Sequence, residues 1–258
     1  MRQYTYSYGR SRYEDPPPLG VRAGAILALA GVLVLFAGPV AYRFGWLSLR
    51  VAAGQVFIWG AYLGGFAALL SLLGLVAALR RRVGRRGIGR AVLAVLVGAV
   101  AFRAGGRIPF VTPDAALADV TTDTANPPAY VAVPPLRGAA ASDLTYQGEA
   151  LAARQRAAYP DIEPLVLAAP KDRVFARAVA AVRDLGWTLV AADGPQGHIE
   201  ASARTRLFGT VDDVVVRVVE TEGGSRVDVR SVAREGDQAG TSPAARVREM
   251  LRALTAAS

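Results

Sequence analysis

Residues 204–236, RTRLFGTVDDVVVRVVETEGGSRVDVRSVAREG, contain a polar turn, a strand, a Gly-Gly turn and a second strand. Successive side chains of a strand point to opposite faces, so the alternating valines of both strands share one apolar face. That face carries Val214, Val216, Val218, Val227 and Val229, and the opposite face carries Arg217, Asp228 and Arg230. The stretch therefore predicts an antiparallel hairpin with one face turned toward a core.

The charges on the polar face predict the register of this hairpin. Pairing Arg217 with Asp228 places opposite charges across the ladder, whereas a two-residue shift sets Arg217 against Arg230. Opposite charges stabilise such a pair, and like charges destabilise it, by a few tenths to ~1 kcal/mol. We therefore expect Arg217 and Asp228 to be cross-strand neighbours.

The sequence around this hairpin predicts a helix, four strands and a second helix over residues 170–258. Apolar residues from Val174 to Leu185 recur at helical spacing, and residues 187–192 and 198–204 have the composition of strands. Ser242 and Pro243 are residue types preferred at a helix start. The apolar stripe of this last helix comprises Val247, Met250, Leu251 and Leu254. The order predicts an α+β domain, an antiparallel sheet of about four strands with two main helices on one face.

The charge of the chain is divided unevenly. Its net charge is +9, yet residues 1–111 hold 14 arginines and two acidic residues, for a net of +12. Residues 112–258 hold 16 basic and 19 acidic residues, for a net of −3. The basicity thus belongs to the apolar half of the chain, which argues against nucleic acid as a partner of the domain. The absence of cysteine excludes disulfides and thiolate sites.

Three apolar stretches within residues 19–110 predict transmembrane helices and therefore a lipid bilayer as a partner. A helix of roughly 20 apolar residues crosses the ~30 Å hydrocarbon core. The third stretch has only 12 uninterrupted apolar residues, from Ala91 to Phe102, and reaches full length only with Arg103 and Arg107 in its outer turns. The expected spans are residues 22–42, 51–79 and 88–108.

The arginines after the second span predict the orientation in the membrane, because short arginine-rich loops remain in the cytoplasm. This loop contains Arg80, Arg81, Arg82, Arg85, Arg86 and Arg90, whereas the first loop contains only Arg43 and Arg50. We expect a multi-pass protein of the inner (plasma) membrane with a disordered cytoplasmic tail at residues 1–18. Three spans place the C-terminal domain outside the cytoplasm, and two would leave it inside.

Residues 111–169 are predicted to be an extended, proline-rich segment that wraps the domain. Asn126-Pro127-Pro128 and Pro134-Pro135 exclude regular helix, since proline lacks the N–H that a helix interior needs. A short helix is expected at residues 148–158. Apolar side chains available to anchor the segment are Tyr130, Val131, Val133 and Leu136.

Three blocks of this sequence resemble the domain of unknown function family 1499, a bacterial envelope and plastid group. They are DVTTDTANPPAYVAVPPLR at 119–137, LGW at 185–187, and LFGTVDDVVVRV with VDVRSVAREG at 207–218 and 227–236. The resemblance implies a third span and an exported domain, and it implies no activity. The sequence departs from the family at Thr210, where an aromatic residue is usual, and at Ala233, where serine is usual. The loop DQAGTSP lacks the family's Ser-Asp pair and asparagine.

Asp212 and Asp213 are candidates for acid–base chemistry or for binding a hard cation. Adjacent side chains on a strand point to opposite faces, so strand-entry capping and pairing with arginines is the favoured interpretation. Arg217, Arg230 and Arg234 are candidates for an anion site. The nearby Asp212, Asp213 and Asp228 favour a structural network of ion pairs instead.

His198 is the only histidine and, together with Asp228 and Arg234, is a candidate for ligand binding. It has no cysteine or second histidine to complete a zinc site, and no G-x-S-x-G motif supplies a serine for a catalytic triad. We expect a strand residue near a turn, and we expect no metal or cofactor.

Two functions remain open at this point. The favoured one is a non-catalytic domain that binds a partner or ligand of the cell envelope. The alternative is an enzyme acting on envelope material through Asp212, Asp213, Arg217 and Arg230. Convergence of these four side chains on a concave pocket favours the enzyme, and pairing along a flat sheet face favours binding. The oligomeric state does not follow from the sequence.

Overall fold

The computed structural model describes residues 19–80, 85–107, 117–138, 141–235 and 243–256. The predictions for the tail at 1–18, for Arg81 and Arg82 and for Ser242 fall outside these residues. The chain forms two compact units. One contains Met1–Gly38 and Gln55–Ile108, and the other contains Pro39–Gly54 and Pro109–Ser258.

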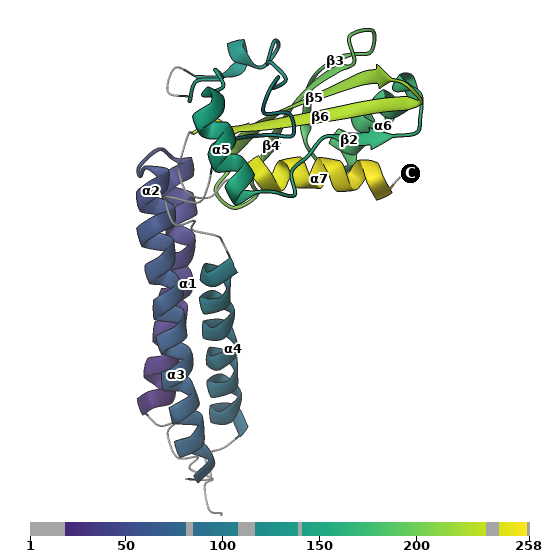
Figure 1. Cartoon of the computed structure of the whole chain (residues 1–258). Helices are drawn as coiled ribbons and strands as arrows, with labels where there is room; N and C mark the ends of the chain where they lie inside the picture. The colour runs from purple at the N-terminus through teal and green to yellow at the C-terminus, as the bar shows by residue number, and fades with distance from the viewer. Residues whose placement is uncertain (1–18, 81–84, 108–116, 139–140, 236–242, 257–258) are drawn as a thin grey trace, which may run out of the picture. The chain divides into compact units, whose positions relative to one another are not determined.

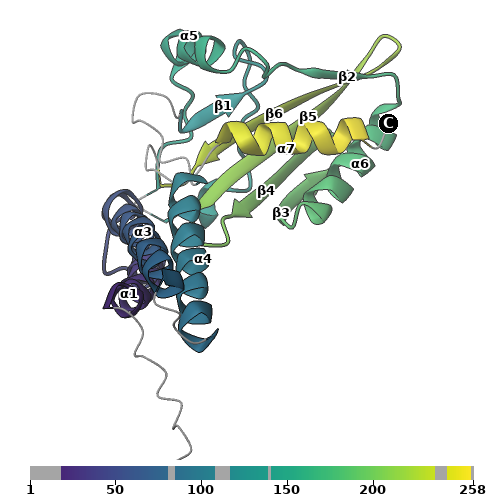
Figure 2. The ribbon, with the colours of Figure 1, turned by 90° about the horizontal axis from the view of Figure 1, so that it is seen from below.

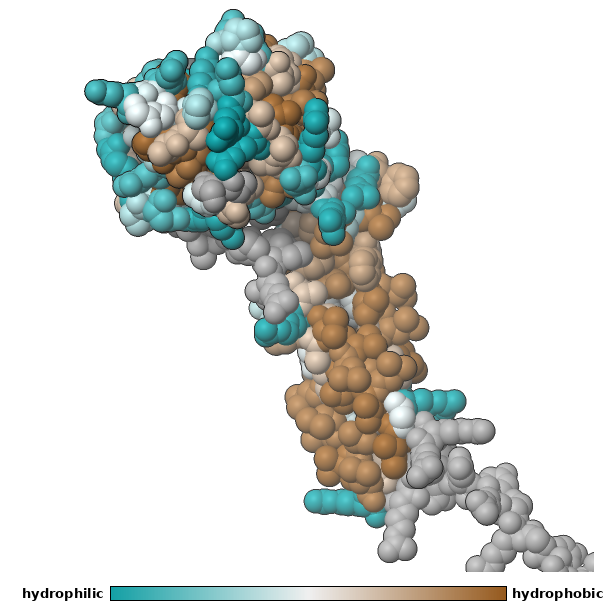
Figure 3. Space-filling view, turned by 90° about the vertical axis from the view of Figure 1, so that its right-hand side faces the viewer, coloured by the Kyte–Doolittle hydropathy of each residue, from teal (hydrophilic) through white to brown (hydrophobic). Residues whose placement is uncertain are grey.

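The N-terminal helices are α1 (Leu19–Arg43), α2 (Leu49–Val51), the π-helical turn η1 (Ala52–Phe57), α3 (Ile58–Arg80) and α4 (Arg85–Arg107). Large apolar side chains such as Leu33, Trp59 and Phe66 are more than half exposed on them. Figure 3 shows hydrophobic residues gathered over this helical part of the chain. Such a surface is suited to lipid rather than to water.

Two helices are long and apolar enough to cross a membrane, Leu19–Arg43 and Leu49–Arg80. They correspond to the first two expected spans. The third expected span is not confirmed, although α4 occupies the expected residues as a continuous helix. The physical reason is that Arg85, Arg86, Arg90, Arg103 and Arg107 lie at its two ends and leave only a short apolar run between them.

Small residues allow α1, α3 and α4 to lie close together. A methyl group added at Gly60 of α3 would lie 2.5 Å from the backbone nitrogen of Leu35 in α1. One added at Gly98 of α4 would lie 2.4 Å from the carbonyl oxygen of Gly64 in α3. Gly60 therefore allows close approach of α1, and Gly64 allows close approach of both α1 and α4.

The second unit is built on a six-stranded antiparallel sheet with strand order β1-β6-β5-β4-β3, in which β2 also pairs with β6 (Figures 1 and 2). The strands are β1 (Asp119–Thr121), β2 (Leu165–Leu167), β3 (Thr188–Asp193), β4 (His198–Arg204), β5 (Val211–Thr221) and β6 (Gly224–Ala233). The other elements are the 3-10 turn η2 (Pro134–Leu136), α5 (Gly148–Ala158), α6 (Lys171–Asp184) and α7 (Pro243–Ala256).

The α+β class is confirmed, and the expectation of four strands was wrong. β1 and β2 are three residues each and occupy successive parts of the free edge of β6. Strands this short show no clear alternation in sequence. The pairing of β6 with distant segments creates them.

The predicted register of the central hairpin is confirmed. Arg217 of β5 is the cross-strand partner of Asp228 of β6, and Arg217 Nη2 donates to Asp228 Oδ2 at 2.8 Å. The hairpin valines 214, 216, 218, 227 and 229 are buried in the domain core with Val182 of α6 and Met250 of α7. Figure 2 shows α6 and α7 lying across this face of the sheet.

The outer edge of β1 is closed by a side chain. Gln155 of α5 is buried, and its amide accepts from the N–H of Thr121 at 2.9 Å and donates to the carbonyl of the same residue at 2.6 Å. An amide side chain thereby imitates a further strand and satisfies an edge that would otherwise be open to pairing with another chain.

Candidate functional site

The sheet face opposite α6 and α7 is charged, and we call it the charged face. By the strand register it carries His198, Glu200, Ser202, Asp213, Arg217, Asp228, Arg230, Asp119 and Thr121. We call residues 122–138 and 141–146 the covering segment. This segment forms many of the hydrogen bonds and ion pairs made by these side chains. Burying charges is costly unless each one is paired and hydrogen-bonded, so the partners decide what this face can do.

Glu200 holds the middle of the covering segment. The side chain is fully buried and accepts hydrogen bonds from the backbone N–H groups of Val131 at 2.6 Å, Ala132 at 2.9 Å and Val133 at 2.7 Å. His198 Nε2 lies 2.8 Å from the same carboxylate. Burial opposes ionisation, but these hydrogen bonds outweigh it and lower the pKa of Glu200. His198 is thus a partner of this carboxylate.

Arg230 is the most enclosed of the predicted candidates. Its guanidinium forms a two-point ion pair with Asp119, at 2.9 and 2.7 Å, and donates to the carbonyls of Pro128 and Leu144. It also lies 5.4 Å from the ring centres of both Tyr130 and Tyr146. Burial opposes the charge, yet the hydrogen bonds and charge of Asp119 raise the pKa of Arg230. A cation so fully coordinated positions its neighbours and has little capacity left for a ligand.

The two neighbouring aspartates point apart. Asp213 lies on the charged face, where Arg234 binds both of its oxygens, Arg137 Nη1 lies 3.2 Å away and Ser202 donates at 2.8 Å. Asp212 faces the helices, and Arg246 of α7 donates to it at 3.1 Å. The pair therefore forms neither a two-carboxylate acid–base site nor a shared cation site.

Arg217 and Asp228 belong to a four-membered ionic cluster. Asp123 of the covering segment accepts from Arg217 and from Arg226, each at 3.0 Å, and both arginines also contact Asp228. Two carboxylates and two guanidiniums balance one another here. The cluster fastens the start of the covering segment to the hairpin.

The structure thus brings together Arg217 with Asp228 and Asp213 with Arg234, and it separates Asp212 from the other candidates. The important residues that the sequence reasoning missed are Asp119, Arg137 and Glu200, whereas Tyr130 was expected only as an apolar anchor of the wrapping segment. Glu200 had a signal, since it alternates with the core residues Ile199 and Ala201 on β4. Asp119 and Arg137 had no local signal, because their partners lie far away in the sequence.

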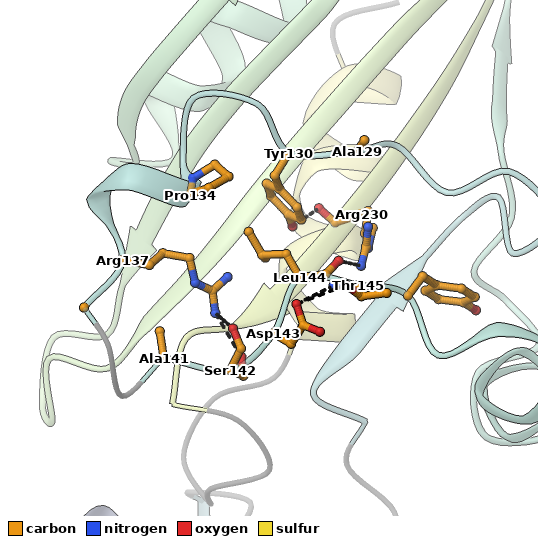
Figure 4. Close-up of a pocket in the computed structure, with 12 residues that line it drawn as sticks. Ala129, Tyr130, Pro134, Arg137, Ala141, Ser142, Asp143, Leu144, Thr145 and Arg230 are labelled. Atoms are coloured by element: carbon orange, nitrogen blue, oxygen red, sulfur yellow. Dashed lines mark hydrogen bonds between the residues drawn. The ribbon is translucent and has the colours of Figure 1, made fainter.

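A shallow hollow of about 560 Å³ opens between the covering segment and Arg230, and we call it the Tyr130 hollow (Figure 4). It is lined by Ala129, Tyr130, Pro134, Arg137, Gly138, Ala141, Ser142, Asp143, Leu144, Thr145, Tyr146 and Arg230. The hydroxyl of Tyr146 is buried there, with no hydrogen-bond partner within the described part of the chain. Arg137 donates to the carbonyl and the hydroxyl of Ser142, both at 2.9 Å.

The hollow combines two aromatic rings with arginine and backbone groups. Among its lining residues there is no histidine or cysteine, and the carboxylate of Asp143 accepts from the N–H and the hydroxyl of Thr145 at 3.0 and 3.1 Å on the exposed rim, as in a local turn. Over the described residues, no three acidic, histidine or cysteine side chains are grouped as ligands for a metal ion. The composition of the Tyr130 hollow therefore suits the binding of a ligand.

Comparison with known proteins places the domain in a family. The model of the family described as "Protein of unknown function (DUF1499)" matches residues 119–254, from β1 to the last helix. The search of curated proteins gave no match. The match covers more than half of the chain and includes β1, the central hairpin and Arg246. The chain therefore belongs to the DUF1499 family.

Proposed function

We propose that this chain is an integral membrane protein with three spanning helices that presents its α+β domain outside the cytoplasm. The domain binds a ligand or partner of the cell envelope and catalyses no reaction. The observation that carries this proposal is the state of the charged face. Its carboxylates are buried and paired with arginine or with backbone N–H groups, beneath a segment that the same contacts hold in place.

The third span is supported by the packing of α4. This helix is continuous over Arg85–Arg107 and approaches α3 closely at Gly98. Arginines near the ends of a spanning helix can extend to the headgroups at modest cost. An α4 that crosses the bilayer places the domain on the side opposite the arginine-rich loop.

A binding function is favoured over the enzyme alternative by the directions of the candidate side chains. Asp212 and Asp213 point to different faces, and among the four proposed catalytic residues only Arg230 lines the Tyr130 hollow. General acid–base catalysis needs a titratable group within reach of a substrate proton. Asp213 is instead buried and held by arginines.

We assign the ligand site to the Tyr130 hollow. Tyr130 and Tyr146 supply flat apolar surface with a polar edge, and the rim residues Asp143 and Thr145 are exposed. Tyrosine is favoured in recognition surfaces because it offers large contact area with little loss of side-chain freedom.

A photo-crosslinking amino acid at Thr145 in the full chain, in intact cells, tests this assignment. We expect a discrete crosslinked product from Thr145 and none from the matched position Arg173, an exposed residue of α6 on the helical face of the domain. Equal labelling at both positions, or none at Thr145, contradicts the site. Turnover of an envelope substrate that is lost in Asp213→Asn contradicts the non-catalytic function.

A further inference from the structure

We propose a second binding site in the same compact unit, for the phosphate group of an anionic phospholipid headgroup. Seven residues line a hollow of about 500 Å³, which we call the Arg43 hollow. They are Tyr42, Arg43, Gly45, Arg204, Phe208, Gly209 and Glu235. They come from the last turn of α1 and the loop after it, from the last residue of β4 and its connection to β5, and from the turn that follows β6.

Two guanidinium groups meet at Gly209. Arg43 Nη2 donates to the carbonyl of Arg206 at 2.7 Å, and Arg204 Nη1 donates to the carbonyl of Gly209 at 2.8 Å. A methyl group built on Gly209 would lie 3.4 Å from Arg43 Nε and 3.7 Å from Arg204 Nη1. The turn needs glycine here, since its φ is +79°. The guanidinium groups of Arg43 and Arg204 therefore lie beside Gly209, and their hydrogen bonds to backbone carbonyls fix their orientation.

The positive charge of this pair is not neutralised. Within the part of the chain that the structure describes, no carboxylate forms an ion pair with Arg43 or Arg204, unlike the arginines of the charged face. Glu235, the acidic residue among those that line the hollow, is hydrogen-bonded to groups other than these two arginines. It accepts from the hydroxyl of Tyr42 at 3.4 Å and from the N–H of Val211 at 3.3 Å. Two cations against one carboxylate leave a net positive hollow, which suits a phosphate.

The place of the hollow in the sequence indicates a lipid as the source of that phosphate. Arg43 is the last residue of α1, a helix long and apolar enough to cross a membrane, so it lies where such a helix leaves the hydrocarbon. Just after it, Phe44 and Trp46 are 69% and 72% exposed and stack with ring centres 5.2 Å apart. Exposed aromatic residues beside arginines are typical of the level of the lipid headgroups.

The apolar wall of the hollow also suits a lipid better than a free anion. Phe208 is buried and packs edge-on against Tyr42, with ring centres 6.3 Å apart. A phospholipid can place its phosphate on the arginines and its glycerol and first methylenes against these rings. Inorganic phosphate has no group to occupy that wall. The inference is independent of any ligand in the Tyr130 hollow.

Native mass spectrometry of the full chain in detergent tests the site with defined lipids. We expect phosphatidylglycerol to bind the wild-type protein at least tenfold more tightly than zwitterionic phosphatidylcholine. The double variant Arg43→Gln/Arg204→Gln is expected to lose about thirtyfold in phosphatidylglycerol affinity, from about 1 kcal/mol per arginine at an anionic surface. Arg206→Gln is the matched control, because this exposed arginine lies in the same loop and does not line the hollow.

A loss in Arg206→Gln as large as that in the double variant overturns the site in favour of diffuse charge attraction. Displacement of the lipid by equimolar inorganic phosphate overturns the lipid as the occupant. The variant Arg43→Lys/Arg204→Lys keeps both positive charges and is the control for loss of binding through misfolding. It is expected to retain phosphatidylglycerol binding within about fivefold, and a loss equal to that of the glutamine variant contradicts recognition by charge.

Discussion

At the scale of single residues, the charged face shows how burial changes the role of a conspicuous side chain. Arg217, Asp213 and Arg230 resemble site residues in the sequence because they are charged and close to a turn. In the structure each is held by a partner from the covering segment or from a neighbouring strand. A buried charge contributes little net stability when paired and costs several kcal/mol when its partner is removed.

The first prediction concerns Glu200. The carboxylate of Glu200 accepts from three backbone N–H groups, and Glu200→Gln replaces one of its two oxygens with an NH₂ group that can only donate. The domain should therefore lose about 2–3 kcal/mol of unfolding free energy at pH 7. Denaturant unfolding of the full chain, followed by the fluorescence of the buried Trp187, measures this loss. The exposed Glu163→Gln is the control and should leave stability unchanged within about 0.5 kcal/mol.

The same residue predicts a pH dependence. The pKa of Glu200 is lowered in the folded chain, so its ionised form stabilises the fold fully above the unfolded glutamate pKa of about 4.3. This stabilisation is lost as the pH falls through the lowered folded pKa. The gap in unfolding free energy between wild type and Glu200→Gln should therefore narrow below about pH 4. A gap that stays constant down to pH 3 contradicts the ionised state.

The second prediction compares two arginines of β6. Arg230→Lys removes a planar fork that binds Asp119 at two points and donates to two carbonyls, so it should destabilise the domain by about 2–3 kcal/mol. Arg226→Lys should cost less than about 1 kcal/mol, because Arg226 is 38% exposed and its partners retain Arg217. Thermal unfolding of both variants provides the measurement, and equal losses would show that enclosure of Arg230 has no energetic consequence.

At the scale of elements, local patterns predicted the helices and the central hairpin well. α5 spans the expected residues 148–158, and the apolar stripe at 174–185 lies on α6 against the core. Gly186 follows α6 with a φ of +71°, as a helix cap requires. Wrapping of the domain by residues 111–169 was expected, but the two short strands and the partners of the charged side chains could not be found this way. They depend on which distant segment pairs with the edge of β6.

A third prediction belongs to the packing of the apolar helices. Gly60→Ala places a methyl group 2.5 Å from the backbone of α1, so the helices must separate, and the thermal stability of the full chain in detergent should fall. Gly89→Ala in α4 is the matched control, since a methyl group there meets nothing within 4 Å. Gly89→Ala should be neutral or slightly stabilising because alanine is the better helix former. A Gly60→Ala protein as stable as Gly89→Ala would contradict the close approach.

At the scale of the whole molecule, the proposed position of the domain outside the cytoplasm depends on whether α4 crosses the membrane. With three spans, alkaline phosphatase fused after Ser258 should be active and green fluorescent protein at the same place should be dark. Deleting residues 88–108 should exchange the two results. An inactive phosphatase with a bright fluorescent fusion in the intact chain would remove the third span and place the domain in the cytoplasm.

The sequence by itself determined the features that arise from neighbouring residues: the apolar helices, the α+β class, the core face of the hairpin and its Arg217–Asp228 register. These follow from hydrophobic periodicity and from charges only 11 residues apart. Only the tertiary structure decided the six-stranded sheet. It also decided the ion pair of Arg230 with Asp119, 111 residues away, and the hydrogen bond from the N–H of Val131 to Glu200, 69 residues away. Side-chain periodicity records which face of an element is buried, whereas the partner of a buried charge is chosen by how distant segments fold together.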